Sequence, residues 1–145
     1  MRAQSAGTLV LPLLLFAAAS AAATPAQVVG LKLQDSTIDP SISHMRIGVD
    51  PAQVKPGRVT FEAVNESKSL MHEVVVVHKS GALPFDAKHD RVKESDVRRL
   101  GEIADLAPGA TGKLTLNLGP GTYVLFCNEP GHYKDGMIAR VVVAP

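Results

Sequence analysis

The segment 126–137 constrains this chain most, because it holds the only cysteine of the 145 residues together with two further metal-binding side chains. Cys127 is followed five positions later by His132, and Met137 follows five positions after that. One proline and two glycines lie between these residues and break both helix and strand. β-Prone runs flank the segment at 123–126 and 138–143. The pattern therefore predicts a loop between two strands that carries three candidate ligands.

Thiolate, imidazole and thioether donors together suit copper that cycles between Cu(I) and Cu(II). A trigonal copper site needs a second imidazole, which must come from elsewhere in the chain. His72 is the best candidate, because it begins the most strand-like run of the sequence, residues 72–78. We therefore predict one type 1 copper ion, with two histidines and a cysteine in a plane and a long axial methionine. The predicted ligands are His72, Cys127, His132 and Met137.

A buried, inert thiol is the alternative interpretation of Cys127. A single cysteine cannot form a disulfide within the chain, so it is either a free thiol or a ligand. The matching set of His72, His132 and Met137 favours the ligand.

At these residues the chain resembles the cupredoxins, the blue-copper family of plastocyanin, azurin, auracyanin and rusticyanin. The spacing from Cys127 to His132 to Met137 is similar to that of rusticyanin and auracyanin, and the run 130–132 is similar to plastocyanin. The resemblance implies a Greek-key β-sandwich and an electron carrier rather than an enzyme. It also implies that electrons leave through the edge of His132. One departure is Glu73, where the family often has an Asn or Ser that ties the two ligand segments together.

Short strands at regular spacing independently indicate an all-β sandwich or barrel. We expect strands at residues 28–33, 43–49, 58–64, 72–78 and 111–118, a strand that ends at residue 127, and a last strand that runs to residue 143. The highly charged stretch near residues 86–100 is the exception. Ser95 as N-cap and Gly101 as C-cap predict a short helical insertion there.

The N-terminus predicts export. Arg2, an apolar run at 9–19 and small residues through Ala23 are typical of a secretory signal peptide over residues 1–23. Residues 24–145 then form one copper-binding domain in the periplasm, without a membrane span. Subtracting Arg2 from the 15 basic residues leaves 14, equal to the 14 acidic ones, which argues against nucleic acid as a partner.

Two functions fit this pattern. The first is a monomeric electron carrier that docks redox proteins such as cytochromes or oxidases near His132, with Leu70, Met71, Pro130 and Pro84 as candidate patch residues. The second is copper handling, in which the domain sequesters copper or delivers it to an oxidase. The sequence lacks the Met- and His-rich tracts expected of a dedicated copper carrier. An enzyme is not expected, because the chain has no His-x-His pair for further copper ions.

Overall fold

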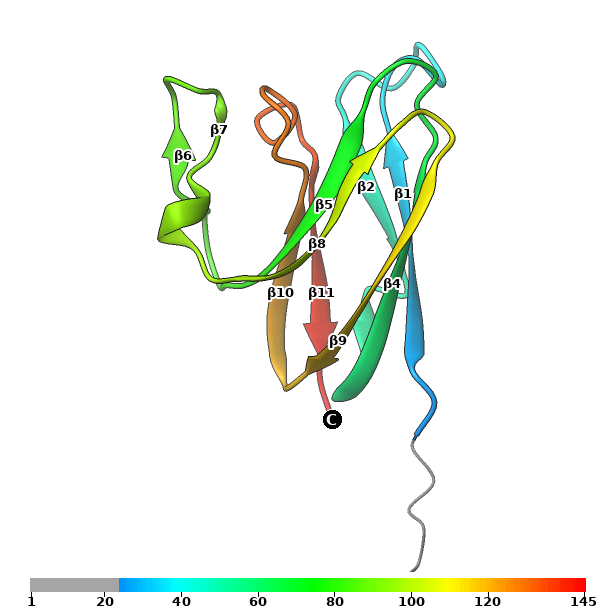
Figure 1. Cartoon of the computed structure of the whole chain (residues 1–145), viewed down its shortest axis with the longest axis vertical. Coiled ribbons are helices and arrows are strands. Elements are labelled where there is room, and N and C mark those ends of the chain that lie inside the picture. Colours follow the sequence, from blue (N-terminus) through cyan, green and yellow to red (C-terminus); the bar gives the residue numbers. More distant parts are fainter. Residues whose placement is uncertain (1–23) are drawn as a thin grey trace, which may run out of the picture.

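The computed structural model describes residues 24–145, which form two β-sheets packed face to face (Figure 1). The predicted signal peptide, residues 1–23, lies outside the described residues. The first sheet has the strand order β2-β1-β4-β9, with bounds β1 Gln27–Gln34, β2 Arg46–Asp50, β4 Gly57–Asn65 and β9 Thr111–Leu118. The second has the order β3-β11-β10-β5-β8, with bounds β3 Gln53–Val54, β5 His72–His78, β8 Arg99–Leu106, β10 Gly121–Phe126 and β11 Ile138–Val143. The all-β sandwich predicted from the sequence is confirmed.

The register of the sheets places the ends of two distant strands together. β1 pairs with β4 in parallel and β3 pairs with β11 in parallel, while the other pairs are antiparallel. β5 and β10 lie side by side in the second sheet, with Val75 opposite Phe126. The start of β5 and the end of β10 therefore meet at the same end of the sandwich. His72 opens β5 and Cys127 directly follows β10, so this pairing brings both to one place.

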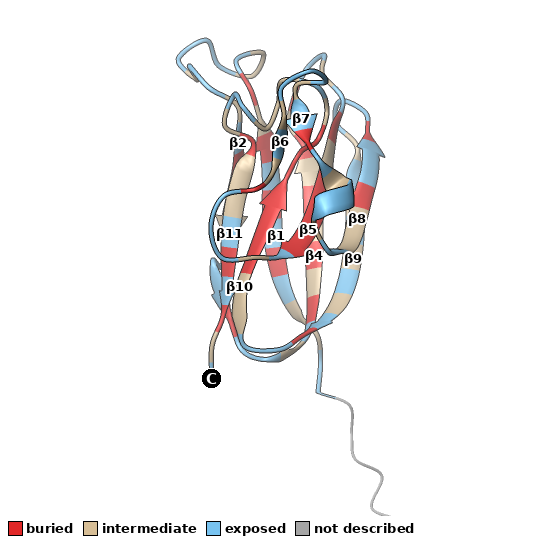
Figure 2. Ribbon diagram, turned by 90° about the vertical axis from the view of Figure 1, so that its left-hand side faces the viewer, coloured by how far each residue is buried: buried red, intermediate tan, exposed pale blue. Residues whose placement is uncertain are grey.

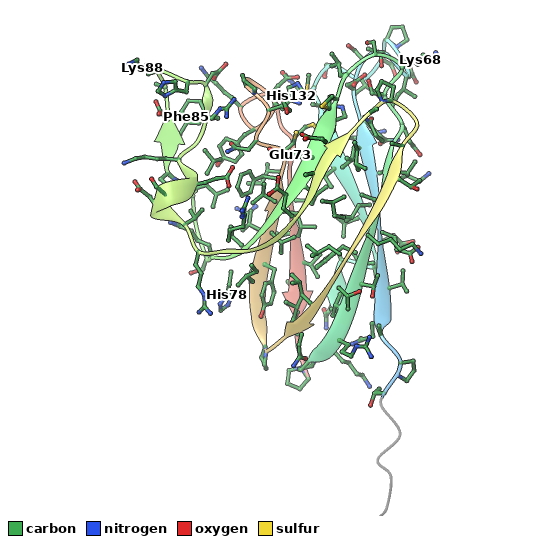
Figure 3. The ribbon with its side chains drawn as sticks, in the orientation of Figure 1. Lys68, Glu73, His78, Phe85, Lys88 and His132 are labelled. Atoms are coloured by element: carbon green, nitrogen blue, oxygen red, sulfur yellow. The ribbon has the colours of Figure 1, made fainter. Side chains whose placement is uncertain are left out.

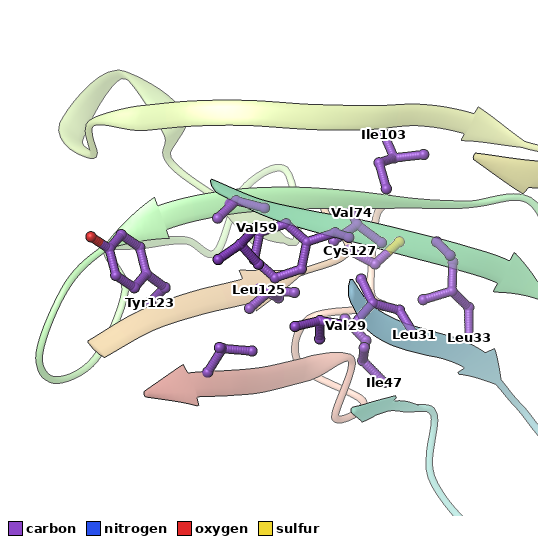
Figure 4. Packing of buried hydrophobic residues seen from close by; sticks show 14 of the residues in the cluster. Val29, Leu31, Leu33, Ile47, Val59, Val74, Ile103, Tyr123, Leu125 and Cys127 are labelled. Atoms are coloured by element: carbon purple, nitrogen blue, oxygen red, sulfur yellow. The ribbon is translucent and has the colours of Figure 1, made fainter. Parts of the chain in front are cut away.

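Alternating side chains build the core between the sheets. In β1, Val29, Leu31 and Leu33 are buried while their neighbours point outward, and β4 repeats the pattern. This is the period of two expected for a sheet with one face in the core. Figure 4 shows these side chains packed against others from the second sheet, with Cys127 among them.

β5 differs because nearly the whole strand is buried (Figure 2). Its inner face joins the main core, and its outer face contributes Val75 and Val77 to a second apolar cluster. Leu83 and Val92 cover that outer face from the insertion between β5 and β8. A strand buried on both faces reads as a continuous apolar run, which explains why residues 72–78 show so little alternation.

The insertion is not the short helix that we expected near residues 86–100. It is a small hairpin of β6 (Phe85–Asp86) and β7 (Arg91–Val92) followed by one 3-10 turn, Glu94–Asp96. Ser95 lies inside that turn, and Gly101 lies within β8 rather than at a helix end. Pairing of β7 with β6 and burial of Val92 outweigh the weak helix signals of this stretch. Within residues 24–145 no helix is long and apolar enough to cross a membrane.

β8 is a strand that the sequence does not reveal. It forms the edge of the second sheet and packs on β9, the edge of the first. Glycines permit this approach, because a Cβ on Gly101 would meet Leu114 at 2.9 Å and one on Gly112 would meet Ile103 at 2.4 Å. β8 was not predicted because its residues do not alternate regularly between apolar and polar, and because a glycine within a strand weakens the β signal.

Candidate metal centre

Two segments meet at the loop end of the sandwich and bring three metal-binding side chains together. The donor atoms of His72, Cys127 and His132 all lie within 4.8 Å of one another. Nδ1 of His132 lies 3.2 Å from Nδ1 of His72 and 3.4 Å from Sγ of Cys127, and Sγ lies 4.0 Å from Nδ1 of His72. His72 and Cys127 are fully buried, and His132 is partly exposed. The three therefore form a compact pocket of one thiol and two imidazoles.

Backbone hydrogen bonds fold the ligand loop back on itself. The N–H of Cys127 donates to the carbonyl of Met137 over 3.1 Å, and the N–H of Met137 donates to the carbonyl of His132 over 3.0 Å. Gly136, at φ +110°, lies so close to the chain before β2 that a Cβ there would meet the carbonyl oxygen of Met45 at 2.7 Å. The side chain of Met137 is fully buried in the main core cluster, which also contains Cys127. The loop thus places the fourth predicted ligand in the same buried cluster as Cys127.

Burial sets the protonation of the donors. It raises the pKa of the Cys127 thiol to about 12, although backbone N–H groups of Glu73 and Glu129 oppose this rise. Burial also lowers the pKa of both histidines, and the neighbouring His72 lowers that of His132 further. At neutral pH the metal-free pocket therefore holds neutral imidazoles, which are ready to bind a metal, and a thiol that must lose its proton to do so.

Glu73 joins the two ligand segments. Its backbone N–H donates to Sγ of Cys127 over 3.4 Å, and its Oε1 accepts the backbone N–H of Asn128 over 3.0 Å. Burial raises the pKa of Glu73, as do the neighbouring carboxylates of Glu102 and Glu94. Glu73 departs from the residue type usual in the family, yet it makes a link between the segments through its carboxylate.

The insertion is attached to the ligand loop by Asn128. Its Oδ1 accepts the N–H of Val92 over 2.7 Å, and its Nδ2 donates to the carbonyl of Val92 over 3.0 Å and to Oε1 of Glu94 over 2.7 Å. The N–H of Gly131 donates to the carbonyl of Asp90 over 2.8 Å. The hairpin therefore braces the outer side of the loop.

Asp35 completes the surroundings of the pocket, and the sequence reading missed it. Its Oδ2 lies 3.1 Å from Nε2 of His72, and its side chain is only 1% exposed. Burial acts to raise the pKa of Asp35, but hydrogen bonds from Ser67, Thr37 and His72 outweigh it and lower that pKa to about 2. Nothing in the spacing links residue 35 to residue 72, because Asp35 follows β1 in the first sheet while His72 opens β5 in the second, and the contact depends on how the two sheets pack.

Two large apolar side chains, close to ligand residues in the chain or through stacking, are exposed at the surface. Met71 is 46% exposed and Phe85 is 37% exposed, and both belong to the segments next to the pocket. Figure 3 shows His132 near Glu73 at the end of the sandwich that also carries Phe85, whereas His78 lies at the far end of β5. The ring of Tyr133 stacks on Phe85 with centroids 6.1 Å apart.

Comparison with known proteins agrees with this geometry. Residues 38–144 match the family model of copper-binding proteins of the plastocyanin/azurin family. This chain belongs to that family. Its cofactor is therefore copper, and three of the four predicted ligands, His72, Cys127 and His132, lie together as a type 1 copper site requires. Membership also agrees with the expectation of an electron-transfer protein rather than an enzyme.

Solved structures support the fold of this cupredoxin. Dithionite-reduced auracyanin of Roseiflexus castenholzii matches with a TM-score of 0.57 and 20% identity over 86% of this chain and 100% of that one. Auracyanin B matches with a TM-score of 0.56 and 23% identity, covering 84% and 91%. Rusticyanin of Thiobacillus ferrooxidans matches with a TM-score of 0.58 and 19% identity, covering 81% and 76%. Comparison with curated protein sequences gave no match.

Proposed function

We propose that this cupredoxin is a monomeric periplasmic electron carrier that holds one type 1 copper ion through His72, Cys127, His132 and Met137. Copper in such a site accepts and returns one electron. The observation that supports this proposal most directly is the convergence of three donor atoms within 4.8 Å, from two segments locked together by hydrogen bonds. A rigid ligand set favours fast transfer, because few protein groups must move when the charge of the site changes.

The chain supplies this rigidity in three ways. β5 and β10 are neighbours in the second sheet, so the positions of His72 and Cys127 are set by the sheet itself. Glu73 links the two ligand segments directly, and Asn128 ties the ligand loop to the insertion. Burial keeps water away from the thiolate.

His132 is the proposed exit for electrons. It is the more exposed of the two ligand histidines. Two exposed apolar side chains belong to neighbouring residues, because Met71 directly precedes His72 and Phe85 stacks on Tyr133, which directly follows His132. The other patch residues expected from the sequence are Leu70, Pro130 and Pro84, and together with Met71 and Phe85 they form the proposed docking patch. The near-zero net charge of the chain after residue 23 implies weak long-range steering, so docking of a cytochrome or an oxidase would depend on apolar contact.

The proposed location follows from the leader. The basic residue, apolar run and small residues of the first 23 positions direct export, which places the copper domain in the periplasm.

The visible spectrum of copper-loaded protein tests the proposal. A thiolate-bound Cu(II) should give an intense charge-transfer band, and Cys127→Ser should abolish it. Thr115→Ala is a control, because this variant removes an exposed side-chain oxygen of the Thr60–Thr115 contact in the first sheet and touches no ligand. A band that persists in Cys127→Ser would rule out the type 1 assignment.

A further inference from the structure

We propose that Asp35 is a positioning residue of the metal centre: its carboxylate selects the metal-binding tautomer of His72 and places a fixed negative charge behind that ring. The first half concerns the protein without metal, and the second half depends on the copper function proposed above. Asp35 touches none of the predicted donor atoms directly. It acts through His72.

The contact is built from two buried side chains. Oδ2 of Asp35 lies 3.1 Å from Nε2 of His72, and the two side chains are 1% and 0% exposed. On the other side of the imidazole ring, Nδ1 of His72 faces Nδ1 of His132 at 3.2 Å and Sγ of Cys127 at 4.0 Å. The ring therefore lies between the carboxylate and the pocket, with one nitrogen directed at each.

Hydrogen-bond chemistry then decides which nitrogen carries the proton. A neutral imidazole has one N–H and one lone pair, whereas an ionised carboxylate can only accept. Asp35 thus holds the proton on Nε2 and leaves the lone pair on Nδ1, which faces the pocket. A carboxylate on the outer nitrogen of a ligating histidine also raises the basicity of that ligand. Its negative charge favours Cu(II) over Cu(I), because Cu(II) carries one more positive charge.

A purely structural role for Asp35 does not account for its contact with His72. Oδ1 accepts both the backbone N–H and the hydroxyl of Thr37, which closes a turn after β1. The Thr37 hydroxyl in turn accepts the N–H of Lys68 over 2.9 Å and contacts Ser67. These bonds tie two loops together through Oδ1, and Ser67 also hydrogen-bonds the carboxylate of Asp35. Oδ2 contacts His72, so the two roles belong to separate oxygens and can be tested separately.

The variant Asp35→Asn separates the role of Oδ1 in the turn from the role of Oδ2 at His72, and it does so in the metal-free protein. Two Thr37 donors face Oδ1, so the amide oxygen should stay on that side and the NH₂ group should face Nε2 of His72. An NH₂ group only donates, so it favours the opposite tautomer, with the proton on Nδ1. Thr37→Val is the matched control, because it weakens the turn and leaves the Oδ2 contact intact.

The first measurement is ¹⁵N NMR of the His72 ring in metal-free protein. We expect the Nε2–H tautomer in the wild type and in Thr37→Val, and a shift toward Nδ1–H in Asp35→Asn. The inference is overturned if His72 of the wild type carries its proton on Nδ1. It is also overturned if His72 has the same tautomer in Asp35→Asn as in Thr37→Val. If Asp35→Asn does not fold, the wild-type tautomer alone decides the first half.

The second measurement is the reduction potential of the copper-loaded proteins. Loss of an outer hydrogen-bond partner typically lowers metal affinity by about 10–100-fold. We expect Asp35→Asn to weaken the binding of Cu(II) more than the binding of Cu(I). Each tenfold increase in the ratio of Cu(I) affinity to Cu(II) affinity raises the reduction potential by about 59 mV. Thr37→Val should stay at the wild-type potential. Equal potentials in wild type and Asp35→Asn overturn the charge effect.

The two measurements separate this inference from the proposed function. If Asp35→Asn changes the His72 tautomer but the copper-loaded wild type shows no thiolate band, the positioning role of Asp35 is supported and the copper-carrier proposal is rejected. A normal thiolate band with no effect of Asp35→Asn ends only the inference about Asp35.

Discussion

The backbone N–H of Glu73 donates to Sγ of Cys127 over 3.4 Å, although 54 positions separate the two residues. The side chain of the same Glu73 accepts the N–H of Asn128 over 3.0 Å. One residue thus links the thiol and the backbone of the ligand loop to the strand that carries His72. A carboxylate makes this link where the family often has a shorter polar side chain.

Replacing Glu73 tests this link. Glu73→Ala leaves the N–H of the buried Asn128 without its acceptor, which should lower the free energy of unfolding by about 1–3 kcal/mol. Glu73→Gln keeps an acceptor oxygen and removes repulsion with Glu102, so it should be at least as stable as the wild type. Urea denaturation of metal-free protein measures both. Equal stability of the Ala and Gln variants would show that the side-chain link contributes little.

Met137 should tune the potential rather than hold the metal. Met137→Gln should retain copper and lower the reduction potential, because a harder oxygen donor favours Cu(II), while Met137→Leu should raise it. Voltammetry of both copper-loaded variants measures the shifts. Because Met137 is fully buried, thermal unfolding of the metal-free variants serves as the control for packing. Loss of all copper in both variants would instead make Met137 a strong ligand.

Metal binding should release one proton from Cys127 at pH 7. Burial raises the pKa of this thiol to about 12 and lowers the pKa of both histidines, so only the thiol has a proton to lose. The apparent affinity for the metal should therefore rise about tenfold per pH unit from the histidine pKa values up to about pH 12. At pH values below the histidine pKa values, the affinity should decrease more steeply, because the imidazoles are also protonated there.

Calorimetry with Zn(II), a redox-inert metal that binds Cys and His, measures this proton. Titrations in two buffers of different ionisation enthalpy should give one proton per metal for the wild type and none for Cys127→Ser. Zero release by the wild type would mean that the thiol does not bind as a thiolate.

The surface near His132 should control the rate of electron exchange. Met71→Lys places a charge in the exposed apolar patch and should slow electron self-exchange several-fold, measured by NMR line broadening, without changing the visible spectrum. Val28→Lys is a matched control, because Val28 is similarly exposed, at 50%, but lies at the opposite end of β1 from Asp35. Equal slowing by both variants would place the docking site elsewhere.

The same sample separates the carrier from a copper-handling protein. A carrier should exchange electrons fast, with little dependence on salt, and should keep Cu(I) when a chelator competes for it. Slow exchange together with ready release of Cu(I) would instead identify copper delivery as the function.

Residues close in sequence determined most of the candidate ligands. Cys127, His132 and Met137 lie on one loop, so their types and spacing already indicate a copper site. His72 could be added because it opens a strongly β-prone run, and the structure brings it to Cys127 and His132. Strands such as 72–78, 111–118 and 138–143 were predicted with their observed bounds, because β propensity and turn residues are local properties.

The tertiary structure alone decided the surroundings of that site. The contact of Asp35 with His72 spans 37 positions and joins the end of β1 in the first sheet to the start of β5 in the second, so it depends on how the two sheets pack, which no local pattern encodes. The helix expected near residues 86–100 became a hairpin because Val92 is buried against β5 and Asn128 binds its backbone. Sequence thus determined the donor atoms, since these depend on residue type. Their hydrogen-bond partners depend on which strands become neighbours, and only the packed fold settles that.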